Sequence, residues 1–257
     1  MINLVKAEVF RLFNRRFLYI FWGILIFLTF IIISPMKAPM DDLIALSKVM
    51  LVLPVFLWPL LTDAITGEEF KDHTYINTVT FGITRLKFFF TKTIVSCFLV
   101  FMTVLIVVIT WCLSASLAIG SMVSGELLIN FLASITAALP LYLAAMILST
   151  LLMFLLRKSS LAIFFYWGII GFSYFINIVQ SYNTVKFGPF YDALLTTQLT
   201  QLVGPVKMIH INTAAIKLST AGGGITDTKQ LFTAAIIGTI YIMVFILSGA
   251  FLNRKWK

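Results

Sequence analysis

The chain has 257 residues, of which 60% are hydrophobic and only 11% are charged, and its formal net charge is +9. Soluble globular domains are about 45–50% apolar and about 25% charged, so this composition excludes an ordinary soluble enzyme, a disordered protein and a nucleic-acid-binding module. In so apolar a chain, Lys and Arg are expected on the cytoplasmic flanks of membrane spans rather than on a nucleic acid. We therefore predict an all-α protein with a single transmembrane domain over residues 1–257.

Residues 1–16 predict an amphipathic helix at the membrane interface. Apolar and polar residues recur there at helical spacing and fall on opposite faces. A basic amphipathic helix lies in the headgroup plane, held by apolar burial and by attraction to anionic lipid. The predicted apolar face holds Ile2, Val5, Val9, Leu12 and Phe13, and the predicted polar face holds Lys6, Arg11, Asn14 and Arg15. The alternative is a simple extension of the first span.

Six apolar segments are long enough to be candidate spans, because a membrane helix needs about 20 apolar residues. They cover residues 17–34, 43–65, 88–119, 127–156, 161–180 and 231–252. The third and fourth are longer than a bilayer requires, so they are expected to tilt, kink or project into water. Pro54, Pro59 and Pro140 lie inside these segments and favour kinks. Lys48 lies inside the second segment, where an ionisable group is either a cargo or gating residue or a side chain that snorkels to the interface.

The distribution of basic residues predicts the orientation. Thirteen of the 19 Lys and Arg residues fall within 6–16, 71–92, 157–158 and 254–257, and the other six lie on the opposite flanks. Because cytoplasmic flanks are enriched in Lys and Arg, both ends of this sequence are expected on the cytoplasmic side of a cell membrane.

The predicted cytoplasmic loop 66–92 holds much of the clustered charge of the chain. Thr66 and Glu69 have capping-box spacing, which predicts that a short helix begins there. Gly82 is expected to break the helical tendency, and residues 86–92 are expected to form a second short helix that runs along the surface into the third span. The alternative is a solvated loop whose basic residues only set the topology.

The long connection 181–230 is predicted on the outer side. An amphipathic stretch formed by Phe190, Leu194, Leu195, Leu199 and Leu202 predicts a short helix half-buried at the outer leaflet. Motifs for catalysis are missing throughout the sequence. The nearest match to a phosphate loop, Gly120 to Gly125, is followed by Glu126 instead of Lys. We expect no catalytic, metal or cofactor site in this chain.

The order of these parts resembles the type 2 ABC export permeases, the membrane subunits of peptide, lantibiotic-immunity, polysaccharide and drug exporters. Within the cytoplasmic loop, Glu69, His73-Thr74, Thr84-Arg85 and Lys92 match the spacing of the family motif, with departures at His73 and near Gly82. The resemblance implies that the loop is a coupling helix that docks on a separate ATP-binding subunit. It gives Glu68, Glu69, His73, Thr74, Arg85 and Lys92 roles as coupling contacts or positioning residues.

The resemblance also implies two ATP-binding partner subunits, which bind the ATP, and a second permease chain, identical or different, that completes the pathway. The expected cargo is an amphipathic or hydrophobic compound such as an antimicrobial peptide, with Lys48, Pro54 and Pro140 as cargo or gating candidates. Two other classes stay open. A self-sufficient carrier or channel would transport without a partner, and a sensor subunit would keep the coupling loop but would not transport.

Overall fold

The computed structural model describes residues 2–33, 52–72, 74–75, 82–119, 125–182, 192–203 and 228–255. This part of the chain is helical and contains no β-strand, so the all-α prediction is confirmed for it. The helices are α1 (Ile2–Phe13), α2 (Arg16–Ile33), α4 (Leu53–Thr62), the π-helix η1 (Asp63–Gly67), α5 (Glu68–Lys71), α7 (Arg85–Ile119), α8 (Gly125–Leu156), α9 (Ser159–Tyr182), α11 (Leu195–Val203) and α12 (Thr228–Lys255).

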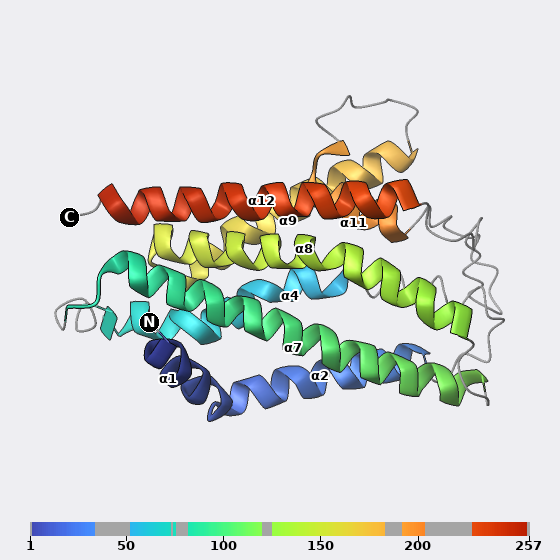
Figure 1. Ribbon diagram of the computed structural model, residues 1–257, viewed down its shortest axis with the longest axis horizontal. Helices are drawn as coiled ribbons and strands as arrows, with labels where there is room; N and C mark the ends of the chain where they lie inside the picture. Colours follow the sequence, from blue (N-terminus) through green and yellow to red (C-terminus); the bar gives the residue numbers. More distant parts are fainter. Residues whose placement is uncertain are drawn as a thin grey trace.

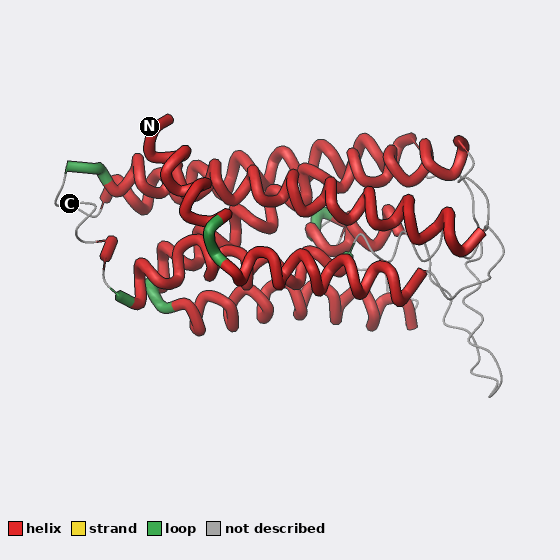
Figure 2. Tube along the Cα trace, turned by 90° about the horizontal axis from the view of Figure 1, so that it is seen from below, coloured by secondary structure: helices red, strands yellow, loops and turns green. Residues whose placement is uncertain are grey.

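Among the described residues, four helices are long and apolar enough to cross a membrane, namely α7, α8, α9 and α12, and a fifth span is present if the bent pair of α1 and α2 counts as one. The second predicted span corresponds to α4 and η1, and its first part lies outside the described residues. The long helices lie side by side along one axis (Figure 1). Helix α1 and the last turns of α12 lie at the same end of this bundle, as Figure 2 also shows. We call this end the terminal end; it also holds α5, the start of α7 and the end of α8.

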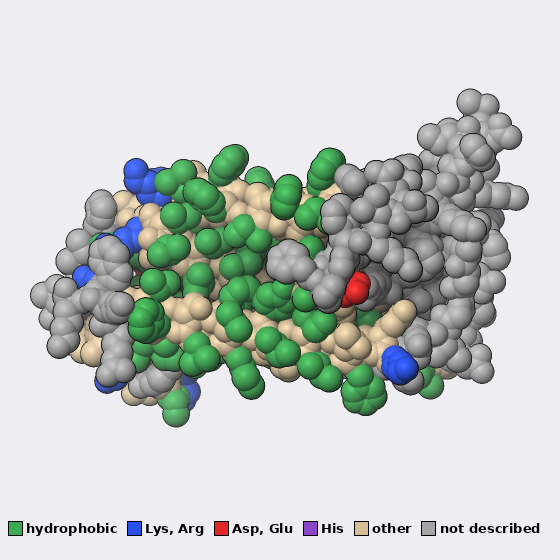
Figure 3. Space-filling model, turned by 90° about the horizontal axis from the view of Figure 1, so that it is seen from above, with side chains coloured by type: hydrophobic (Ala, Val, Ile, Leu, Met, Phe, Trp, Pro, Cys, Tyr) green, Lys and Arg blue, Asp and Glu red, His purple; other side chains and the backbone are tan. Residues whose placement is uncertain are grey.

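The outer surface of the bundle has the character of a lipid-facing belt. Figure 3 shows hydrophobic side chains along the middle of the molecule, with Lys and Arg gathered mainly at the terminal end. Large apolar side chains on α12 point outward, and Phe232 and Leu247 are 72% and 68% exposed. Such exposure is costly in water but not in hydrocarbon, so these faces belong against lipid or another apolar surface.

Helix α7 runs without interruption over 35 residues. Residues 86–92 are helical and continue into the third span, as predicted, and they form the first turns of α7 itself. Residues 85–119 contain neither Gly nor Pro, so nothing in the sequence breaks the helix there. The helix begins after Gly82, which has a φ of 86° as expected for a break, and the Lys87 amide donates to Thr84 Oγ1 at 3.3 Å as in an N-terminal cap.

The prolines have different consequences in different helices. Pro54 lies in the first turn of α4, where its missing N–H is not needed, and the residues that precede α4 in the predicted span lie outside the described part of the chain. Pro59 lies inside the same helix and cannot donate to the Val55 carbonyl. That carbonyl accepts a hydrogen bond of 2.7 Å from the Tyr166 hydroxyl of α9 instead. Pro59 thus leaves the Val55 carbonyl of α4 available for a hydrogen bond to α9.

Helices α8 and α12 pack closely where Gly238 meets Pro140. A Cβ atom at position 238 would lie 2.7 Å from Pro140 Cβ and 2.9 Å from the Leu141 backbone nitrogen. Glycine allows two membrane helices to approach to this distance because it has no side chain. Pro140 lies inside α8, which continues through it, and its place at this contact gives it a packing role.

Candidate functional site: a charged cluster at the terminal end

Helix α1 lies across the terminal end and meets α2 at an angle of 65°. Its buried face contains Leu12, with Val5, Val9 and Phe13 packed against the core. The predicted apolar face is thus confirmed for these four residues, whereas Ile2 is 72% exposed. This packing holds one side of α1 against the bundle and brings its charged residues close to α5 and α7.

The second component is the π-helix η1, which joins α4 to α5. A π turn bonds residue i to residue i+5 and thereby shifts the hydrogen-bond register of the helix. Two carbonyl oxygens of this turn accept hydrogen bonds from other helices: Ala64 from Arg15 Nη1 at 2.5 Å and Ile65 from Arg11 Nη2 at 3.1 Å. Short π segments inside α-helices occur frequently at functional sites.

Gly67 closes the π turn and allows a tight contact. A Cβ atom at this position would lie 1.8 Å from Asp63 Oδ1, so any larger residue would displace the Asp63 carboxylate. That carboxylate accepts a hydrogen bond from the Ser159 hydroxyl at the start of α9. The π turn is therefore attached to α9 on one side and to α1 on the other.

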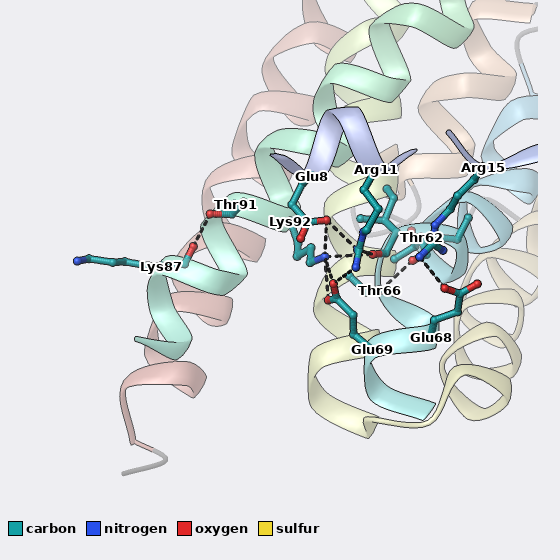
Figure 4. A network of polar contacts seen from close by, with 12 residues as sticks. Glu8, Arg11, Arg15, Thr62, Thr66, Glu68, Glu69, Lys87, Thr91 and Lys92 are labelled. Carbon is teal, nitrogen blue, oxygen red and sulfur yellow. Dashed lines mark hydrogen bonds and ion pairs between the residues drawn. The ribbon is translucent and has the colours of Figure 1, made fainter. Parts of the chain in front are cut away.

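Lys92 of α7 occupies the centre of the site, and its side chain is fully buried (Figure 4). Its Nζ atom lies 2.8 Å from a carboxylate oxygen of Glu8 on α1 and 2.8 Å from Glu69 on α5. The same atom donates to the Ile65 carbonyl at 3.2 Å. The ammonium also lies 5.2 Å from the centre of the Phe88 ring, within the range of a cation–π contact. Three hydrogen bonds satisfy all three donors of the ammonium.

Two arginines of α1 extend this arrangement. Arg11 Nη2 lies 2.7 Å from Glu8 Oε2, and Arg11 Nη1 forms an ion pair with Glu69. One turn further along, Arg15 Nη2 lies 2.6 Å from Glu68 Oε2. We call Glu8, Arg11, Arg15, Glu68, Glu69 and Lys92 the charged cluster. It links α1, α5 and α7 through a four-residue network of Glu8, Arg11, Glu69 and Lys92 and through the neighbouring Arg15–Glu68 pair.

The charges of the cluster balance, with three cationic and three anionic side chains. Burial of a single charge costs several kcal/mol, and a partner offsets this cost only with good geometry and additional hydrogen bonds. Here the buried Lys92 and the nearly buried Glu69 each contact more than one opposite charge or carbonyl. Such a network favours one arrangement of its three helices, because removing Lys92 or Glu69 leaves a buried charge short of a partner.

An aromatic cluster, formed by Phe70, Tyr75, Phe88, Phe89 and Phe154, lies beside the charged cluster. The Phe154 ring of α8 is its centre. It contacts Phe70 edge-on at 5.3 Å between ring centres, Phe89 edge-on at 5.2 Å and Phe88 at 5.5 Å. Such ring pairs stabilise a contact beyond the area they bury. The aromatic cluster thus attaches α5 to α8 while the charged cluster attaches it to α1 and α7.

The structure brings together three of the six predicted coupling residues, namely Glu68, Glu69 and Lys92. Lys92 is fully buried and so holds other residues in place instead of contacting a partner. Arg85 lies elsewhere, half-buried at the start of α7, and Thr74 is exposed. His73 and the cargo candidate Lys48 lie outside the described residues, as do residues 183–191 and 204–227 of the long outer loop.

The predicted capping box at Thr66 is wrong. The chain passes from α4 through η1 into α5 without leaving helical geometry, and no side chain caps α5. Thr66 Oγ1 donates back to the Thr62 carbonyl at 2.8 Å. The Glu69 carboxylate, which the capping box would direct to the Thr66 backbone, pairs instead with Lys92 and Arg11. The carboxylate gains more here because it meets two cationic side chains, whereas the cap would offer it one neutral backbone N–H.

Sequence reasoning missed three members of the charged cluster, namely Glu8, Arg11 and Arg15. Arg11 and Arg15 were assigned to a face directed at headgroups, and the structure turns both toward the carboxylates of α5. One local signal was available: Glu8 and Arg11 are three residues apart, a spacing that allows an ion pair on one helix. Their partners on α5 and α7 are far away in sequence, so no local pattern indicates them.

The charged cluster has the properties of a structural joint. Every ionised group in it is engaged by an opposite charge, and within the described ranges no group of three or more His, Cys, Asp or Glu side chains is placed to hold a metal ion.

Comparison of the chain with protein-family models, with curated proteins and with solved structures finds no significant match. The function must therefore be inferred from the residues and their geometry.

Proposed function

We propose that this chain is the membrane-spanning permease subunit of an ATP-driven exporter of the type 2 ABC class. In this proposal the polypeptide crosses a cell membrane six times, both ends of the chain are cytoplasmic, and two such chains, identical or different, form the pathway. ATP is bound and hydrolysed by separate partner subunits. The expected cargo is an amphipathic or hydrophobic compound such as an antimicrobial peptide.

The observation that carries the proposal is the way α5 is held. A four-residue helix at the terminal end is tied to α1 and α7 by ion pairs and to α8 by aromatic rings. Its outward side presents Glu68, Lys71 and Asp72, followed by Thr74, all of them exposed. A force applied to this polar surface would reach three helices at once, as a coupling element requires.

Two further features support the same proposal. The described helices are long and apolar, and their basic residues gather mainly at the terminal end, as expected for a cytoplasmic flank. The sequence has no phosphate loop, so an energy source based on ATP would have to act through a contact with another subunit.

The proposal assigns two separate roles within this region. Lys71 and Asp72 would contact the ATP-binding subunit, because their side chains are exposed. Glu69 would transmit the movement, because it is buried and joined to Arg11 and Lys92. Variants at the two places should therefore fail in different ways.

The test uses the tagged full-length chain purified from its native membrane together with the ATP-binding subunit that remains bound to it. The complex is placed in proteoliposomes, and ATP hydrolysis and export of a fluorescent amphipathic peptide are measured. We expect Lys71→Ala/Asp72→Ala to release the ATP-binding subunit. We expect Glu69→Gln to retain it while export falls at least tenfold. Lys158→Ala, which changes an exposed basic residue at the same end, is the matched control.

Each alternative class predicts a different result. Export that proceeds without ATP and without the partner subunit would identify a self-sufficient carrier or channel. ATP hydrolysis that responds to the peptide while no peptide crosses the membrane would identify a sensor subunit. Unchanged coupling in Glu69→Gln would refute the role given to the charged cluster.

A further inference from the structure

A second polar site lies at the terminal end, apart from the charged cluster. It is a cleft between the start of α7, the end of α8 and the end of α12. Arg85, Arg157 and Asn253 supply its polar lining, and Phe89, Phe154 and Leu155 supply part of its apolar wall. No acidic side chain is among the described residues that line it. The cleft therefore combines positive charge with an apolar surface.

The backbone at Arg157 is unusual. Arg157 directly follows the last residue of α8 and has a φ of 51°, a conformation in which Gly or Asn is usual and which costs other residues on the order of 1 kcal/mol. Its amide donates to the Met153 carbonyl at 2.9 Å and closes the helix end. A position suited to Gly is occupied here by an arginine that lines the cleft. The cleft is thus lined by one arginine from the end of α8 and one, Arg85, from the start of α7.

The walls of the cleft are held in fixed positions by their own contacts. The Phe89 ring lies against Gly249 of α12, where a Cβ atom would come within 2.3 Å of the ring. Asn253 Nδ2 donates to the Gly249 carbonyl at 2.8 Å, which orients the amide along α12. The Phe154 ring on the α8 side packs edge-on against Phe89. The cleft is thus a preformed feature of three packed helices.

The cleft is continuous with the lipid-facing belt. Leu155, which lines it, is 49% exposed, and Phe251 on the neighbouring turn of α12 is 58% exposed. A ligand in the cleft would therefore meet guanidinium groups at one end and hydrocarbon at the other. Guanidinium groups bind phosphate with paired donors, and basic pockets between membrane helices are known to bind lipid head groups.

We propose that this cleft binds an anionic phospholipid from the membrane leaflet at the terminal end. The phosphate group lies between Arg85 and Arg157, and an acyl chain follows Leu155 into the belt. A free phosphate ion would use the same arginines but would leave the apolar wall uncovered. The inference goes beyond the proposed function and does not depend on it, because a lipid site of this kind fits a carrier or a sensor equally well.

The test measures lipid binding to the purified full-length chain in a mild detergent. Native mass spectrometry follows the retention of phosphatidylglycerol, and thermal unfolding follows the stabilisation it confers. Phosphatidylcholine serves as the neutral lipid and glycerol 3-phosphate as the soluble phosphate. We expect phosphatidylglycerol to be retained at least tenfold better than phosphatidylcholine, and glycerol 3-phosphate not to compete at equal concentration.

The variants are Arg85→Gln, Arg157→Gln and Arg157→Gly, with Lys87→Gln and Lys158→Gln as matched controls. Lys87 and Lys158 are exposed basic residues close to the two arginines in sequence, and neither lines the cleft. Arg157→Gly is the decisive variant, because Gly suits the positive φ, so this change removes the guanidinium group and relieves the backbone strain together. We expect each arginine variant to retain about tenfold less phosphatidylglycerol and to lose most of the lipid-induced rise in Tm.

Three results would overturn the proposal. One is equal loss of binding in the Lys87→Gln and Lys158→Gln controls, which would mean that only overall charge matters. Another is equal retention of the neutral lipid. The third is displacement by glycerol 3-phosphate, which would identify a soluble anion site.

Discussion

The rings of Phe70 and Phe154 meet edge to face with their centres 5.3 Å apart. Phe70 belongs to the four-residue helix α5, and Phe154 lies near the end of α8. So short a helix has little stability of its own, because helix formation needs several turns to offset its initiation cost. The position of α5 therefore depends on this ring contact on one side and on the charged cluster on the other.

Replacing Phe154 with Leu should loosen α5 without unfolding the bundle. The change removes the ring contacts with Phe70, Phe88 and Phe89 but keeps an apolar side chain, so we expect a loss of about 1–2 kcal/mol. Backbone amides of residues 68–72 should exchange with deuterium at least several-fold faster. Phe164→Leu is the control, because Phe164 is 71% exposed on α9. Equal exchange in the two variants would contradict the role of Phe154.

Lys92→Met should be strongly destabilising. It leaves Glu8 and Glu69 with Arg11 as their remaining cationic partner in the cluster, and breaking a buried ion pair on one side costs about 3–5 kcal/mol. Thermal unfolding in detergent should show the loss as a lower Tm. Lys87→Met is the matched control: it lies five residues earlier on α7, is exposed, and points away from the cluster in Figure 4. A similar Tm for both variants would show that Lys92 contributes no more than a surface lysine.

A double variant tests whether Glu69 and Lys92 stabilise the protein through their contact with each other. Glu69→Gln added to Lys92→Met removes a carboxylate that the first change left short of a partner. We expect the two changes together to lower stability by at least 1 kcal/mol less than the sum of the single changes, because residues in one network do not act independently. Additive losses would mean that Glu69 and Lys92 do not stabilise each other.

Gly238→Ala should weaken the contact between α8 and α12. The added methyl group would lie within 3 Å of Pro140 and of backbone atoms that cannot rotate away, so we expect a loss of about 1–3 kcal/mol. Gly168→Ala on α9 meets no atom within 4 Å and should be neutral or slightly stabilising, because Ala favours helix. Thermal unfolding of the two variants in the same detergent makes the comparison. Equal Tm values would show that α8 and α12 accommodate the added methyl group at no cost in stability.

The proposed orientation can be tested with single cysteines in a Cys97→Ala/Cys112→Ala background. Asp72→Cys and Lys158→Cys lie at the terminal end, and Lys229→Cys lies at the opposite end of α12, all three at exposed positions. A membrane-impermeant maleimide applied to intact cells should label position 229 and leave 72 and 158 unlabelled until the membrane is opened. Labelling of position 72 on intact cells would reverse the topology and with it the coupling role of α5.

Much of the architecture could be predicted from local patterns. The apolar runs of α7, α8, α9 and α12 indicate membrane helices because 20 or more apolar residues in succession have few other stable forms. Helix α1 could be predicted from a different pattern, because Val5, Val9 and Leu12 recur at helical spacing. In the structure these residues pack inward. Gly82 was expected to break the helical pattern, and its positive φ confirms the break.

The interior of the site could not be predicted in this way. Lys92 contacts Glu8, which is 84 residues away, and Glu69, which is 23 residues away, and no periodicity relates them. The π turn has no clear sequence signal either, because Asp63 to Gly67 reads as ordinary helix or loop. Thr66 and Glu69 show why local reasoning failed there: their spacing suggests a cap, but distant charges determined where Glu69 points.

The π turn also has a meaning for how the chain tolerates change in length. A π turn is equivalent to one extra residue in an α-helix, and each residue turns an α-helix by about 100°. Deleting any one residue between Asp63 and Gly67 would let the segment relax into a regular helix and would rotate Glu68 and Glu69 away from Arg15 and Lys92. In homologous chains we therefore expect insertions and deletions to be excluded from these five positions, even where the side chains themselves have diverged.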